Sequence, residues 1–66
     1  MTNNLKVQRA IKDISQEELA KQIGVSRQTI NAMEKAKYVP STVLALKISR
    51  FFGLSVEQIF TLEETD

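Results

Sequence analysis

The most constraining feature of the sequence is a pair of short helical runs separated by a glycine. Counted from Gln16, Ala20 leaves room for close helix approach, and Gly24 supplies the positive φ that a tight turn needs. The apolar positions that fall on a shared interior face are Leu19, Ile23, Val25, Ile30 and Met33. Two short helices joined by a turn of three or four residues containing glycine form a helix-turn-helix. The spacing predicts this unit over residues 16–35.

The rest of the chain also has helical periodicity, with clear start and stop signals. The N-cap candidates are Ser15 (with Glu18 as a capping box), Ser26, Ser41 after Pro40, and Ser55 (with Gln58 as a second capping box). Asp13, Gly24 and Gly53 lie where helices are expected to end. The pattern predicts one all-α domain over residues 1–66, with five helices at about 4–12, 16–23, 27–35, 42–52 and 56–60. The fourth would bury Leu44, Ala45, Ile48 and Phe52.

The residue types that are missing exclude several classes of protein. A chain of 66 residues without cysteine or histidine forms no disulfide and lacks the usual zinc ligands. It also has no cysteine or histidine to act as nucleophile or base, and Glu17 and Glu18 diverge on a helix. We therefore expect no enzyme activity, metal, cofactor or small-molecule ligand. No membrane span or signal peptide is evident, so a cytoplasmic location is expected, with no membrane partner.

The charges are unevenly distributed, although the net charge is only +1. Residues 1–50 contain all nine lysines and arginines against four acidic residues, a balance of +5. Residues 51–66 contain four acidic residues and no basic residue, a balance of −4. A polyanion would therefore be attracted to the first part of the chain and repelled by the last.

The segment QEELAKQIGVSRQTINAMEKAKYVPS resembles the Cro/repressor branch of helix-turn-helix regulators, often called the Xre family. The resemblance extends from LKVQRAIKDIS to VEQIF, and the size is similar to that of compact one-domain regulators such as the cytolysin repressor type. It implies a five-helix, lambda-repressor-like fold and operator binding as a homodimer on double-stranded DNA. It also implies regulation of transcription, usually repression, with the protein associated with the nucleoid.

The second helix of the motif contains the residues expected to read DNA bases. Because Ile30 and Met33 face inward, the other side of the helix faces outward or sideways. A major groove admits one helix, and arginine, glutamine, asparagine and the methyl group of alanine each have partners on base edges. The candidate base-reading residues are Arg27, Gln28, Thr29, Asn31 and Ala32.

Other residues are expected to frame that helix on the phosphate backbone. Gln16 begins a helix, where free N–H groups and the positive end of the dipole favour an anion. The resemblance to repressors implies phosphate contacts for Ser26, Lys35, Lys37 and Tyr38. It also implies a structural ion pair between Arg9 and Glu34.

The C-terminal segment, about residues 54–62, is the predicted dimerisation region. The fifth helix is too short to bury its apolar residues inside one small bundle, and an exposed apolar patch commonly marks an interface. The candidate interface residues are Leu54, Val56, Ile59, Phe60 and Leu62. Thr61 and Leu62 are further expected to form a short strand against residues 2–5.

Three rival interpretations are consistent with parts of this pattern. An antitoxin or a restriction-modification controller would bind operators with the same fold. A protein-interaction module that has lost DNA binding would be expected to have an apolar or acidic second helix, unlike Arg27, Gln28, Asn31 and Lys35. For single residues, the rivals are a solvated helix surface for Arg27 and Gln28 and a packing role for Tyr38.

Overall fold

The computed structural model describes residues 1–66 and contains five helices and one two-stranded sheet. The elements are β1 (Thr2–Asn3), α1 (Leu5–Ile11), α2 (Gln16–Ile23), α3 (Arg27–Glu34), α4 (Thr42–Phe52), α5 (Val56–Ile59) and β2 (Phe60–Thr61). Each helix begins and ends within one residue of its predicted range. The predicted all-α fold with a short terminal ribbon is therefore confirmed. None of the helices combines the length and apolarity needed to cross a bilayer.

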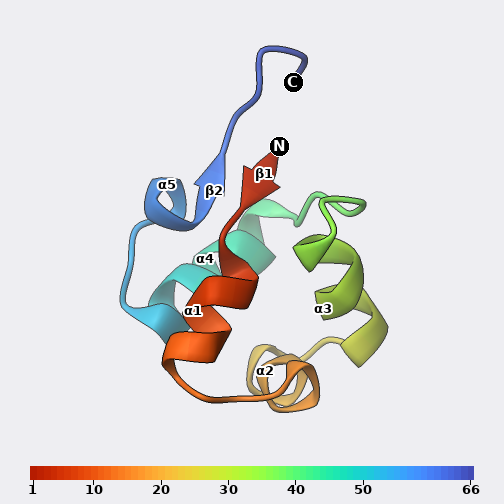
Figure 1. The fold of residues 1–66 in the computed structure, drawn as a ribbon, viewed down its shortest axis with the longest axis vertical. Coiled ribbons are helices and arrows are strands. Elements are labelled where there is room, and N and C mark those ends of the chain that lie inside the picture. Colours follow the sequence, from red (N-terminus) through yellow and green to blue (C-terminus); the bar gives the residue numbers. More distant parts are fainter.

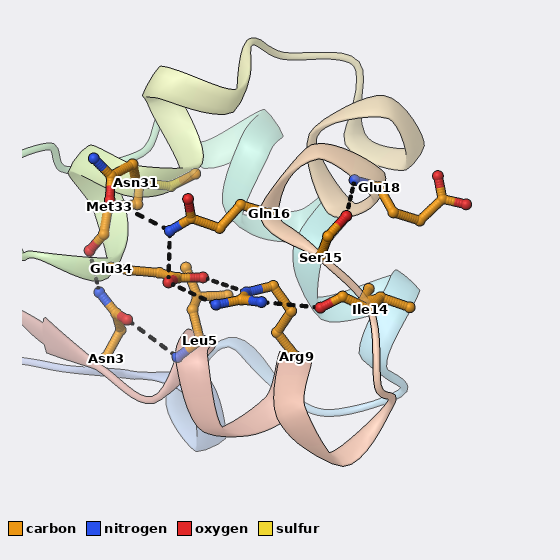
Figure 2. A network of polar contacts seen from close by, with 10 residues as sticks. All are labelled: Asn3, Leu5, Arg9, Ile14, Ser15, Gln16, Glu18, Asn31, Met33 and Glu34. Atoms are coloured by element: carbon orange, nitrogen blue, oxygen red, sulfur yellow. Dashed lines mark hydrogen bonds and ion pairs between the residues drawn. The ribbon is translucent and has the colours of Figure 1, made fainter.

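Serine side chains begin four of the helices, as the sequence predicts. The hydroxyls of Ser15, Ser26, Ser41 and Ser55 each accept a hydrogen bond from the backbone N–H three residues later. The reciprocal bond of a capping box forms at Ser55 with Gln58. The capping box predicted for Ser15 and Glu18 is wrong in its second half, because the Glu18 side chain points away from the helix start (Figure 2). The Glu18 side chain is exposed, and a carboxylate that remains in water keeps its rotamer freedom.

Four turns use the left-handed backbone region next to a helix end. Gly24 and Gly53 follow α2 and α4 with φ of 85° and 67°. Asp13 and Ala36 follow α1 and α3 with φ of 54° and 58°, although both have a Cβ atom. Such a conformation costs a non-glycine residue roughly 1 kcal/mol or more. The turn at Ala36, after α3, is therefore strained, whereas the turn at Gly24, between α2 and α3, is not.

Replacing Ala36 with glycine is expected to stabilise the protein by about 0.5–1 kcal/mol, because the Cβ penalty outweighs the extra chain entropy that glycine loses. Urea unfolding monitored by circular dichroism measures the difference. Ala10→Gly, inside α1, is the matched control and is expected to destabilise by a similar amount. A destabilised Ala36→Gly variant would show that the turn is not strained.

The helices form a single bundle that is closed at one end by the small sheet. α2 packs against α3 and α4, α1 against α3, and α4 against α5. β1 and β2 lie side by side at the end that carries both termini, and α2 lies at the opposite end (Figure 1). The strands are antiparallel, with Thr2 opposite Thr61 and Asn3 opposite Phe60. The ribbon is thus one residue earlier on its C-terminal side than the predicted strand of Thr61 and Leu62.

Ten apolar side chains from all five helices and β2 form the core. They are Leu5, Leu19, Ala20, Ile23, Ile30, Met33, Leu44, Ile48, Ile59 and Phe60. Ile59 and Phe60, both predicted to lie at a subunit interface, are only 1% and 5% exposed in the single chain. The small sheet helps to cover these two side chains, which the four-residue helix α5 alone would leave exposed. Leu54 and Val56 are half-buried, and Leu62 is 78% exposed.

Candidate nucleic-acid interface

The outer face of α3 carries a shallow polar hollow. Ile30 and Met33 are fully buried, and this fixes the rotation of the helix. Arg27, Gln28 and Asn31, all predicted to read bases, line the hollow together with Gln16 from α2. Arg27 and Gln28 are exposed, and no ion pair within the chain involves Arg27. The structure thus brings three of the five predicted base-reading residues to one accessible surface.

The other two predicted base-reading residues lie at the edge of this surface. Thr29 and Ala32 are half-buried. The Thr29 hydroxyl lies 2.9 Å from the hydroxyl of Ser26, the N-cap of α3. One of these two hydroxyls donates to the other, so the pair retains one free donor for a phosphate or a base.

An ion pair joins α1 to the last turn of α3. Arg9 donates from Nε to Glu34 Oε2 at 2.8 Å and from Nη2 to Glu34 Oε1 at 3.2 Å. Its Nη1 donates to the carbonyl of Ile14 at 2.9 Å. The side chains of Arg9 and Glu34 are 18% and 5% exposed. This two-bond geometry between the predicted partners holds the end of α3 against α1.

The Glu34 carboxylate also binds Gln16, which begins α2. Gln16 Nε2 lies 3.0 Å from Glu34 Oε1 and 3.3 Å from Asn31 Oδ1 (Figure 2). Burial raises the pKa of Glu34, but the hydrogen bonds from Arg9 and Gln16 outweigh it and leave that pKa below its ordinary value. Glu34 is therefore ionised at neutral pH. The Gln16 side chain has both of its N–H groups engaged, so its predicted phosphate contact rests on the backbone N–H groups at the start of α2.

The remaining predicted phosphate-binding residues flank α3 on its accessible side. Ser26 precedes the helix, and Lys35, Lys37 and Tyr38 follow it; all four are exposed. The backbone N–H of Lys37 donates to the carbonyl of Ala32 at 2.9 Å and folds this turn back onto α3. The acidic residues Glu63 and Asp66, by contrast, contact the amino group of Met1 at 3.0 and 2.8 Å. This places them at the end of the molecule opposite α2 (Figure 1).

Asn3 supports the end of α3 from β1, and sequence reasoning missed it. Its Nδ2 donates to the carbonyl of Met33 at 2.7 Å, and its Oδ1 accepts from the backbone N–H of Leu5 at 3.1 Å (Figure 2). An asparagine side chain readily accepts from the backbone N–H two residues later, which accounts for the second bond. Nothing local signals the first, because its partner lies 30 residues away.

Comparison with known proteins agrees with this geometry. A helix-turn-helix family model matches residues 5–59. The chain is 54% identical to an HTH-type transcriptional regulator of Methanocaldococcus jannaschii, over all of both chains. It is 50% identical to the HTH-type transcriptional regulator YgzD of Bacillus subtilis, over 97% of each chain.

A phage protein is also similar to part of this chain. The identity to the cryptic phage CTXphi transcriptional repressor RstR, from Vibrio cholerae, is 33% over 88% of this chain and 52% of that protein. Family proteins of this kind bind DNA and regulate transcription. The motif at residues 16–34, the polar outer face of α3 and these relatives lead to one conclusion: the chain belongs to the Cro/repressor (Xre) family of helix-turn-helix transcriptional regulators.

Proposed function

We propose that the protein is a homodimeric repressor that inserts α3 into the major groove at each half of a palindromic operator. The observation that supports this most directly is the accessible hollow lined by Gln16, Arg27, Gln28 and Asn31. Arginine and glutamine side chains without partners inside the protein have hydrogen-bonding groups that are free to contact base edges. Repression is favoured over activation by the similarity to RstR, which is named as a repressor.

The proposed contacts fall into two kinds. Arg27 and Gln28 read bases, with Thr29, Asn31 and Ala32 beside them. The phosphate backbone is met by Ser26, Lys35, Lys37, Tyr38 and the backbone at Gln16. If each subunit neutralises about three phosphates, the logarithm of affinity falls against the logarithm of salt concentration with a slope near −5.

The proposed dimer surface is an apolar groove between the 35–41 turn, α4 and α5. It is lined by Met1, Val39, Pro40, Thr42, Ala45, Leu46, Val56 and Phe60. Val39 and Leu46 are 64% and 57% exposed. Leu62, which directly follows β2, is 78% exposed. A 66-residue chain without covalent cross-links gains stability by covering such a surface with a second copy. Val56 and Phe60, both from the predicted interface set, line this groove.

Base reading is tested by selecting bound sites from random duplex DNA at one fixed salt concentration. The wild-type protein is expected to select palindromes with half-sites about one helical turn apart. Arg27→Ala and Gln28→Ala are each expected to relax the preference at one or two positions per half-site, at a cost of roughly 1–3 kcal/mol per lost contact. Lys37→Ala is the control and is expected to weaken all duplexes alike and to flatten the salt dependence. Unaltered preferences in both α3 variants would refute the assignment.

A further inference from the structure

The turn after α3 is closed by two backbone hydrogen bonds. The N–H of Lys37 donates to the carbonyl of Ala32 at 2.9 Å. The N–H of Ala36 donates to the carbonyl of Met33, also at 2.9 Å. This pair of bonds is the Schellman ending of a helix, in which the residue in the left-handed region is usually glycine. Ala36 occupies that position here, with φ of 58°, so the turn contains a backbone conformation that its own sequence disfavours.

A side chain from β1 supplies a third hydrogen bond to the same turn. Asn3 Nδ2 donates to the Met33 carbonyl at 2.7 Å, so this oxygen accepts two bonds, one for each lone pair (Figure 2). The turn after α4 has the same backbone pattern with Gly53 in the left-handed position, and no side chain donates to its matching carbonyl, that of Arg50. The bond from another element is thus present at the turn that lacks glycine.

Lys37 is the residue whose place depends most directly on this turn. It follows Ala36, and its side chain is exposed and forms no ion pair within the chain. The penalty for an alanine in the left-handed region is comparable in size to the net contribution of one hydrogen bond. Loss of the Asn3 bond would therefore open the turn in an appreciable fraction of molecules, and Lys37 would lose its fixed place beside α3.

We propose that Asn3 is a positioning residue for DNA binding, which holds the turn after α3 in the conformation that places Lys37 on the phosphate backbone. This rests on the proposed function, in which Lys37 contacts a phosphate. A turn that is already formed binds without the cost of selecting it from an open population. Because phosphate contacts carry no sequence information, Asn3 contributes to the affinity for every duplex and to no base preference.

Asn3→Ser tests the proposal and spares the local structure of β1. A serine hydroxyl still accepts from the N–H of Leu5, two residues later, but it is too short to reach the Met33 carbonyl. The variant is expected to bind every duplex about tenfold more weakly, about threefold for each turn of the dimer, with unchanged base preferences. Asn4→Ser is the matched control, because Asn4 donates at 3.0 Å to the carbonyl of Gln58 in α5, and it is expected to leave the affinity unchanged.

Two double variants separate positioning from a general loss of stability. In the Lys37→Ala background, Asn3→Ser is expected to cause no further loss of affinity, because the side chain that the turn presents is gone. Ala36→Gly favours the left-handed conformation without the Asn3 bond, so it is expected to restore the affinity of Asn3→Ser. Every affinity is measured on protein that circular dichroism shows to be folded. A loss that persists in either double variant would overturn the proposal.

Hydrogen exchange in the free protein provides a readout without DNA. The backbone amide of Lys37 is expected to exchange about threefold faster in Asn3→Ser and to return to its wild-type rate when Ala36→Gly is added. An unchanged rate in Asn3→Ser would overturn the proposal. If Lys37→Ala binds as tightly as the wild-type protein, the phosphate contact of the proposed function is refuted, and the role of Asn3 with it. If Lys37→Ala weakens binding and Asn3→Ser does not, only the positioning by Asn3 is refuted.

Discussion

Arg9→Ala is expected to lower the free energy of unfolding by about 2 kcal/mol or more, within the range for broken buried ion pairs. The loss is large because Glu34 is only 5% exposed, so its carboxylate stays buried after its main partner is removed. Removal of the Arg9 side chain also breaks its hydrogen bond to the carbonyl of Ile14, at the turn between α1 and α2. Chemical denaturation at neutral pH measures the change.

An exposed arginine provides the matched control for this prediction. Arg50, in the last turn of α4, makes no ion pair, and Arg50→Ala is expected to change the stability by less than about 0.5 kcal/mol. Similar small effects for both variants would mean that the pair behaves as a surface pair.

The pH dependence follows from the direction of the Glu34 shift. The pKa of Glu34 in the folded protein lies below the ordinary value of 4.5, so ionised Glu34 makes its full contribution to the free energy of unfolding above pH 4.5. The contribution is lost as the pH falls through the lowered pKa of the folded state, because the proton then breaks the pair. The stability gap between wild type and Arg9→Ala is therefore expected to narrow as the pH falls below 4.5. A gap of constant size down to pH 2 would assign the loss to packing alone.

The sequence predicted the helices closely because their signals are local. Serine caps, the glycines at positions 24 and 53, and the apolar spacing each depend on a few neighbouring residues, and the helix limits follow them within one residue. The outward position of Arg27 and Gln28 followed from the inward position of Ile30 and Met33 in the same way.

Contacts between distant segments were predicted less well. A short strand against residues 2–5 was predicted, but the periodicity of residues 54–62 does not indicate that Ile59 and Phe60 are buried within the single chain. The bond from Asn3 to Met33 and the double use of the Gln16 amide have the same origin. Both need the folded arrangement, since short polar side chains have many equivalent partners in sequence.

The apolar groove gives the second large expected effect. The double variant Val39→Asp and Leu46→Asp is expected to be monomeric at micromolar concentration and to bind the operator at least about a hundredfold more weakly. The two-fold symmetry of a dimer would bring four unpaired carboxylates into one apolar interface, where each is costly. A monomer still meets a half-site, but it loses the second recognition helix that the dimer holds in place.

The double variant is suited to this test because both side chains are exposed in the single chain. Ile59 and Phe60 are not, and a charge at either would unfold the core before it reported on the interface. Val7→Asp with Ile11→Asp, two exposed apolar residues of α1, is the matched control and is expected to stay dimeric. Analytical ultracentrifugation measures the mass, thermal melts check the fold, and operator titration measures the affinity. A groove variant that remains dimeric, or a control that dissociates, would move the interface to another face of the bundle.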